Sequence, residues 1–496
     1  MQQVQYKKGR PSKGVALLLL SAGLLCCFGQ TEQQSRQAMQ AKQWMSEGRF
    51  EDAAKAYKAL SDAMPANTGL RLNTGLALHM AGRAAESVPY FEAVLKADPA
   101  ALPALLSLGM ARLQLNQPAA AVAPLSKAVT MVPNQVDARG MLANALLSLD
   151  RPDEAAPHFR KLTTLTPQDV RAWSGLGKCY ESLAAKSFEQ IPRGSAEWLA
   201  LIADTRFVQR QFRAAFYFYK QALEKDPKMR GVHAAVARVY EQTGNAEWAA
   251  QEQVKEKALP KAVCTVDKQE CDYEAGRYLE ASAGKSAYWR TRAFNELATR
   301  AFAQLGKLPP SPDLYLLKAE LASQRGQHAE AAKELAEALR LVPGDRRLEY
   351  NYAASVFLSG DYEKAIPLLE REMNRDAKNA EIYFFLGSAY SRLSRAEDAL
   401  TYLRAAVAYD PKFLDARAAL GRALAQSGKA AEAIPHLEAA LPQDEDGSLL
   451  YELSRAYQAA GDREKARAAV AKYQEIRGKL EDEKRSLEEE VKITPP

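Results

Sequence analysis

Residues 48–57 read Gly-Arg-Phe-Glu-Asp-Ala-Ala-Lys-Ala-Tyr, and Pro65 follows eight residues after Tyr57. Proline returns every thirty-four residues from there, with an alanine or serine twelve residues before it and a tyrosine, phenylalanine or leucine eight before it. A glycine, asparagine or aspartate stands five residues before each alanine or serine. The proline column is Pro65, Pro99, Pro133 and Pro167, and the alanine column is Ala53, Ser87, Ala121 and Ala155. The large column is Tyr57, Phe91, Leu125 and Phe159, and the turn column is Gly48, Gly82, Asn116 and Asp150. The alanine column continues at Ala215, Ala249, Ala331, Ala365, Ala399, Ala433 and Ala466, which gives eleven units.

Each column has a physical cause in a helical hairpin. Glycine, asparagine or aspartate lets the chain reverse between two helices, because these residues tolerate the backbone angles of a tight turn. The alanine column lets two helices approach closely, and the large residue four positions later fills the next gap on the same face. Proline ends the second helix because it lacks an N–H group and restricts the residue before it. One hairpin cannot bury its apolar face alone, so the pattern predicts an all-α solenoid of stacked hairpins.

The pattern resembles the tetratricopeptide repeat (TPR) family from residue 35 to about residue 478. The stretches from Gly48 to Tyr57 and from Gly360 to Ala365 match the family's turn and second helix. The family's small residue on the first helix forms a further column, the small column, in all eleven units. Its members are Ala41, Gly75, Gly109, Ala143, Ala203, Ala237, Ala319, Ala353, Gly387, Gly421 and Ser454. The resemblance implies a right-handed superhelical α-solenoid of helix-turn-helix hairpins that binds other proteins.

Two breaks in the period divide the chain. The distance from Ala143 to Ala203 exceeds one repeat by about 26 residues, and that from Ala237 to Ala319 by about 48. Residues 182–191 resemble residues 296–305, which hints that the two insertions are related. We therefore expect units one to four at 35–169, a helical insertion at 170–195, units five and six at 196–261, a helical insertion with a Cys-bounded loop at 262–311, units seven to eleven at 312–478, and a charged C-terminal tail at 479–496.

The N-terminus predicts export. A basic stretch from Lys7 to Lys13 precedes an apolar run at 15–28, which has the length of a signal peptide and is short for a membrane span. Residues 1–29 are therefore interpreted as a signal peptide cut before Gln30, and the expected location is the periplasm or cell envelope. Two alternatives stay open. The run could be an uncleaved membrane anchor, or a lipoprotein signal, which it resembles at 24–27, with lipidation of Cys27.

Export bears on the other cysteines. Oxidising compartments preserve disulfides, so Cys264 and Cys271 are a candidate local pair. Two unpaired thiols are the alternative. Cys179 is expected to be a small buried apolar residue.

Composition and motifs exclude several function classes. The formal net charge is +6, but four of the charges come from Lys7, Lys8, Arg10 and Lys13, so the chain from Gln30 onward carries about +2. Nucleic-acid binding needs clustered Lys and Arg, which that part lacks. No nucleophile, phosphate-binding or metal-ligand motif is present, and the five histidines are dispersed. His158 and His436 share a repeat position that favours packing. We expect no enzyme activity, no cofactor and no metal.

A binding surface is therefore expected to carry the function. In TPR proteins the first helices line a concave groove, and four positions around the small column face it. In units two, three, eight and nine these positions are unusually apolar, which is typical of contact sites. The predicted groove residues are Leu72, Leu76, Met80, Leu106, Met110, Leu113, Tyr350, Phe357, Leu358 and Phe384. Coverage by neighbouring side chains is the alternative.

Two functional hypotheses follow. The preferred one is a non-catalytic scaffold of the bacterial cell envelope that gathers protein partners during assembly or secretion, with membrane contact only through the N-terminal segment. An amphipathic helix or an extended apolar segment would suit its groove. The alternative is an accessory or regulatory subunit for a polysaccharide or glycan-handling enzyme on another chain. The sequence predicts neither the partner's identity nor the oligomeric state.

Overall fold

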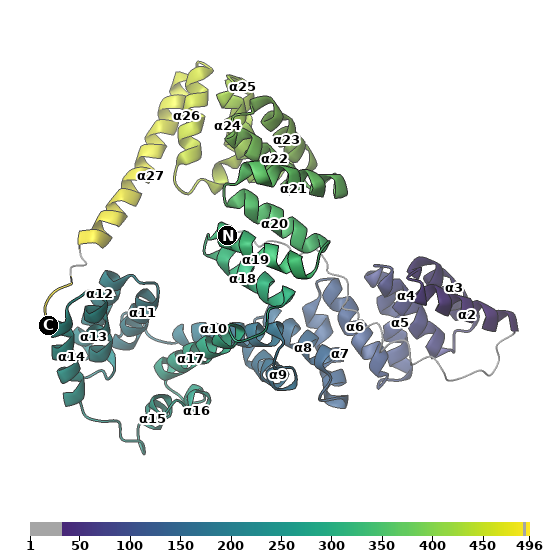
Figure 1. The fold of residues 1–496 in the computed structure, drawn as a ribbon, viewed down its shortest axis with the longest axis horizontal. Helices are drawn as coiled ribbons and strands as arrows, with labels where there is room; N and C mark the ends of the chain where they lie inside the picture. Colours follow the sequence, from purple (N-terminus) through teal and green to yellow (C-terminus); the bar gives the residue numbers. More distant parts are fainter. Residues whose placement is uncertain (1–31, 490–492) are drawn as a thin grey trace. The chain divides into compact units, whose positions relative to one another are not determined.

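The computed structural model describes residues 32–489 and 493–496, and all regular secondary structure in these residues is helical (Figure 1). The predicted signal peptide and Cys27 lie outside the described residues. The chain forms two compact parts, and both are discontinuous in sequence. Residues up to Leu201 join 259–309 in the first part, while 202–258 join 310–496 in the second.

The first part begins with four regular hairpins, and each second helix packs on the first helix of the next unit. The longer helix α10 and three helices from residues 259–309 complete it. Its helices are α2(Glu32–Ser46), α3(Phe50–Ala63), α4(Thr68–Met80), α5(Ala84–Ala97), α6(Leu102–Gln114), α7(Pro118–Met131), α8(Val136–Ser148), α9(Pro152–Leu165), α10(Val170–Phe188), α15(Lys268–Glu274), α16(Tyr278–Ser282) and α17(Ala287–Leu305). Helix α11(Ala196–Val208) crosses the boundary between the parts.

The second part holds the inserted helices α12 to α14 and the run from α18 onward. The last helix, α27, continues without interruption through residue 478, so the predicted tail begins as helix. The helices are α12(Phe212–Lys225), α13(Val232–Gln242), α14(Ala246–Ala258), α18(Pro312–Gln324), α19(His328–Leu341), α20(Arg346–Leu358), α21(Tyr362–Arg375), α22(Ala380–Arg392), α23(Ala396–Tyr409), α24(Leu414–Gln426), α25(Ala430–Ala440), the 3₁₀ turn η1(Leu441–Gln443), α26(Ser448–Ala459) and α27(Arg463–Glu489).

The columns act in the structure as their chemistry predicts. The turn column has positive φ throughout, at 77° for Gly48 and 56° for Asn116. Arg210 and Ser394 hold the same column in units five and nine and also have positive φ, although side chains other than those of Asn and Asp rarely do. The small column receives the large column of the same unit. A Cβ on Gly75 would lie 2.7 Å from the ring of Phe91, so only glycine permits this approach.

The two predicted insertions are one repeat unit that the chain completes after a detour. Gly177 lies thirty-four residues after Ala143, in the small column, and a Cβ there would lie 2.5 Å from the ring of Phe302. On α17, Ala298, Phe302 and Pro310 have the spacing of the alanine, large and proline columns. Helix α17 thus packs along α10 as its second helix (Figure 1). The sequence instead predicted two separate insertions at 170–195 and 262–311. The repeat period does not pair α10 with α17, because residues 189–286 separate these two helices in the sequence.

Contacts along this pair show that the helices run antiparallel, as in any other hairpin. The rings of Tyr180 and Phe294 are 6.2 Å apart, and just past the end of α10 the side chain of Gln190 accepts a hydrogen bond from Arg290. Buried Ala298 and Ala301 of α17 belong to the same hydrophobic cluster as α7 to α10. The discontinuous unit is therefore the fifth layer of the first part.

Candidate partner-binding surfaces

The predicted groove residues of units two and three lie on α4 and α6, first helices that contact each other directly. Leu76 is only 7% exposed and belongs to a core cluster with Phe91 and Leu108. The other five, Leu72, Met80, Leu106, Met110 and Leu113, are half-buried. Leu72, Leu106 and Leu113 pack against core clusters with part of each side chain still accessible. The five half-buried residues thus form a partly covered strip, and the buried Leu76 is not part of it.

The predicted groove residues of units eight and nine lie on α20 and α22. Leu358 is exposed, while Tyr350, Phe357 and Phe384 are half-buried and pack against one core cluster. The Tyr350 hydroxyl donates to Glu381 Oε2 at 2.5 Å, and burial together with that carboxylate raises the pKa of Tyr350. The ring of Phe384 lies 5.0 Å from that of Phe413, which directly precedes α24. Neighbouring side chains therefore cover much of this second strip.

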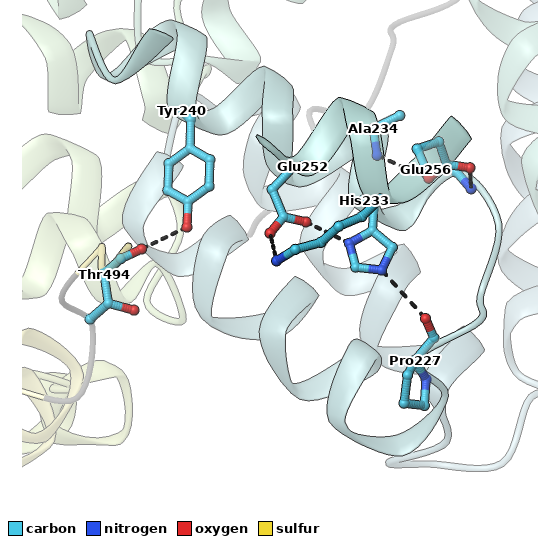
Figure 2. A network of polar contacts seen from close by, with 9 residues as sticks. Pro227, His233, Ala234, Tyr240, Glu252, Glu256 and Thr494 are labelled. Carbon is cyan, nitrogen blue, oxygen red and sulfur yellow. Dashed lines mark hydrogen bonds and ion pairs between the residues drawn. The ribbon is translucent and has the colours of Figure 1, made fainter. Parts of the chain in front are cut away.

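A polar cluster that the sequence did not suggest joins α13 to α14 (Figure 2). Glu252 is 2% exposed, and its carboxylate accepts from Lys255 Nζ at 2.7 Å and from His233 Nδ1 at 2.5 Å. Burial pushes the pKa of Glu252 upward, but the two hydrogen bonds outweigh it and hold the pKa below its ordinary value. The other ring nitrogen of His233 faces the carbonyl oxygen of Pro227 at 3.4 Å. The bond from His233 joins α13 to α14, whereas Lys255 lies on α14 itself and pairs with the carboxylate from the same helix.

One helical turn later, Glu256 closes the start of α13. Its carboxylate oxygens accept from the backbone N–H groups of Gly231 at 2.7 Å and Ala234 at 3.1 Å (Figure 2). These N–H groups have no partner inside the helix, so a carboxylate from the neighbouring helix satisfies them and suits the positive end of the dipole. In Figure 2 the hydroxyl of Tyr240, on the same helix, points to the backbone of Thr494.

The cysteines divide into a bonded pair and a buried thiol. Cys264 and Cys271 form a disulfide at the start of α15. The loop that it closes exposes Val266, with 81% of that residue's surface accessible. Cys179 is buried in the core between α10 and its neighbours, and burial raises its thiol pKa to about 12, which makes it unreactive.

His158 and His436, which share a repeat position, are both half-buried. His158 Nδ1 lies 3.0 Å from a guanidinium nitrogen of Arg139, and burial together with that cation lowers the pKa of His158. Burial and Arg417 do the same for His436. Within residues 32–489 and 493–496, no three His, Cys, Asp or Glu side chains gather closely enough to hold a metal ion. No helix in this described range is both long and apolar enough to cross a membrane.

Two family models match the chain, and both are described as tetratricopeptide repeat. One covers 276–446, and the other covers 39–101, 81–136, 106–170 and 141–186. The matches stop at 186, within α10, and resume at 276, before α16 and α17, so the gap between them covers most of the detour. No curated protein matches the sequence.

Solved structures provide a third comparison. The protein MamA is 21% identical, with 40% of this chain and 93% of that chain covered and a TM-score of 0.30. A tetratricopeptide repeat protein from Parabacteroides merdae is 12% identical over 66% of this chain and 100% of its own, with a TM-score of 0.31. A complex described as Naa15/Naa10 bound to HypK-THB is 14% identical over 92% and 78%, with a TM-score of 0.30.

Proposed function

The chain belongs to the tetratricopeptide repeat proteins, and we propose that it is a non-catalytic scaffold of the bacterial cell envelope that binds segments of other proteins along its first helices. TPR repeats are protein-protein interaction modules. The observation that supports a site in this chain is the strip of half-buried apolar side chains on α4 and α6, formed by Leu72, Met80, Leu106, Met110 and Leu113. The accessible parts of these side chains are what a partner would cover.

The chemistry of the strip favours an apolar occupant. Two methionines lie among three leucines, and methionine adapts its shape to different partners because its side chain is unbranched and polarizable. An amphipathic helix or an extended apolar segment that presents side chains at helical or alternate spacing would contact both α4 and α6.

Site-specific photocrosslinking in the source cells tests this proposal. A photoreactive residue at Met80 or Met110 should link to one or a few defined proteins, whereas the same residue at Ala59 or Ala123, which are exposed on second helices, should not. Adding Leu72→Glu should abolish the link from Met110 without loss of helicity. Leu76 is left unchanged because a charge at this buried position would unfold the unit. Equal linking from Ala59 and Met110 would contradict the proposal, as would recovery of glycan polymers alone.

Export rests on the N-terminal sequence, so its test is separate. The mass of the N-terminal peptide from cell-envelope fractions should show cleavage before Gln30. A diacylated Cys27 would instead indicate a lipoprotein, and an intact Met1 in the membrane fraction would indicate an anchor. A chain with intact Met1 in the cytoplasmic fraction would overturn the envelope location and leave the partner-binding strip untouched.

A further inference from the structure

A tyrosine recurs three residues after the small column, and its hydroxyl has a regular partner. Tyr180 accepts from Arg160 at 3.3 Å, Tyr390 donates to Glu370 at 3.0 Å, and Tyr457 donates to Glu438. Each partner is a charged residue five positions after the alanine column on the second helix of the preceding unit. At this repeat position, a tyrosine hydroxyl is therefore satisfied by its own repeat stack.

Tyr240 occupies the same position on α13 and is the exception. The residue at its partner position is Lys220, whose ammonium lies 5.9 Å from the ring of Phe216. The Tyr240 hydroxyl instead donates to the backbone carbonyl of Thr494 at 2.6 Å, although 254 residues separate the two. Tyr240 is 0% exposed, so its hydroxyl needs an acceptor. Burial and Glu252 raise the pKa of Tyr240 to about 12, and the group stays a donor at physiological pH.

The segment that supplies this acceptor is suited to docking. Residues 493–496 read Ile-Thr-Pro-Pro; Ile493 and Pro496 are half-buried, whereas Thr494 and Pro495 are exposed. Each proline restricts the residue before it to an extended backbone. Two prolines in succession thus fix the segment before it binds and lower the entropy that docking removes.

We propose that residues 493–496 dock within the same chain on α13 as a latch, held by the Tyr240 hydroxyl, and that they join the long last helix α27 to the inserted repeats. Both elements belong to the second compact part. The acceptor that the repeat stack fails to supply at Tyr240 is the backbone carbonyl of Thr494. The latch is independent of the apolar strip on α4 and α6, which lies in the first compact part.

Photocrosslinking of the purified full-length chain tests the docking. A benzoylphenylalanine in place of the exposed Pro495 should link to peptides from α12 to α14 after irradiation. The experiment uses an equal mixture of isotopically light and heavy protein, so that links within one chain contain a single isotope. Links that mix the two isotopes would show docking on a second copy and overturn the latch. The absence of links to residues 212–258 would overturn docking on α13 altogether.

A pair of matched variants tests the hydroxyl. Tyr240→Phe keeps the ring contacts with Phe216 and Trp248, at 5.4 and 5.5 Å, and removes only the donor. The equilibrium constant for docking should fall by about fivefold, as expected for one net hydrogen bond, and the crosslinked fraction should fall with it. Tyr390→Phe removes the same group where its acceptor is Glu370 and should leave the crosslinked fraction unchanged. An equal yield in both variants would remove Tyr240 from the latch.

Discussion

The hairpin of α4 and α5 and the hairpin of α10 and α17 are the same structure built in two ways. In the first, three residues separate Met80 from Ala84. In the second, residues 189–286 separate the two helices, and they include an excursion into the other compact part. Yet both pack a large ring against a small-column glycine, Phe91 on Gly75 and Phe302 on Gly177.

A TPR unit is therefore defined by its columns, and its two helices need not be adjacent in the sequence. The turn of a unit is an exposed connection, and insertions in such connections are tolerated because loop-closure entropy rises slowly with length. Two regular units can therefore enter the turn of another unit, provided that the second helix keeps the alanine and large columns. The predictions below test whether the discontinuous hairpin is as cooperative as the continuous one.

The largest expected effect comes from emptying the ring position in each hairpin. Phe302→Ala should destabilise the α10–α17 pair by about 3 kcal/mol, and Phe91→Ala, at a fully buried ring, should destabilise α4–α5 by about 4 kcal/mol. Because repeat arrays unfold locally, amide hydrogen exchange is the suitable measurement. Phe302→Ala should speed exchange in both α10 and α17 and spare α4 and α5. Faster exchange in α17 alone would show that the two helices are not one unit.

The continuous hairpins could be predicted from the sequence because their signals are local. Within ten residues, Gly48 indicates a turn, Ala53 a close helix contact and Tyr57 a side chain that fills the next gap, and the positive φ of Gly48 confirms the turn.

The columns of the discontinuous unit are also present in the sequence. Gly177 falls ten residues after Pro167, and Ala298, Phe302 and Pro310 repeat the second-helix spacing. Their pairing could not be predicted, because no local feature of the sequence indicates that the helix ending at Phe188 packs against the helix beginning at Ala287.

The sites show the same limit. The apolar positions on α4 and α6 follow from the small column, but the burial of Leu76 depends on contacts with neighbouring helices. Acidic residues on helices are usually exposed, and the buried Glu252 departs from this rule. Its one sequence signal is that it holds the repeat position of His158 and His436. Nothing in residues 493–496 alone indicates a docking segment.

The second prediction concerns the return of the chain from the detour. Removing the disulfide by replacing Cys264 and Cys271 with serine should destabilise the local fold around α15 by about 2.5 kcal/mol, the entropy of a short closed loop. The start of α17 contacts α15, because Tyr273 packs against Trp289 and Arg292 and Gln269 bonds to Ser286. Hydrogen exchange should therefore rise in residues 263–274 and at the start of α17, and stay unchanged in α10 and around Phe302. Faster exchange along all of α17 would mean that the bond also supports the discontinuous hairpin.

The third prediction uses two glycines in neighbouring first helices that should respond with opposite signs. Gly177→Ala places a Cβ within 2.5 Å of the Phe302 ring and should destabilise α10–α17 by about 2 kcal/mol through overpacking. Gly140→Ala on α8 meets only Leu162, at 3.9 Å, and should stabilise by about 0.5–1 kcal/mol because alanine favours the helix. Urea midpoints measured for both variants check the signs. A neutral Gly177→Ala would show that Phe302 does not press on α10.

The smallest expected effect is a difference in how the stability of the inserted hairpin α13–α14 and of the continuous hairpin α8–α9 depends on pH. The pKa of Glu252 lies below its ordinary value of about 4.3, so its stabilisation of α13–α14 is complete at neutral pH and is lost as pH falls below that value. The pKa of His158 also lies below its ordinary value, which is about 6.5, and here the unfolded chain takes up a proton first. Stability of α8–α9 should therefore begin to fall nearer neutrality and level off once the folded protein protonates.

Hydrogen exchange corrected for its intrinsic pH dependence, measured from pH 8 to 3, should show these two windows in the two hairpins. Glu252→Gln should flatten only the acidic window of α13–α14, and His158→Gln only the upper window of α8–α9. If Glu252→Gln left the acidic window of α13–α14 unchanged, that carboxylate would not be charged and paired in the folded hairpin.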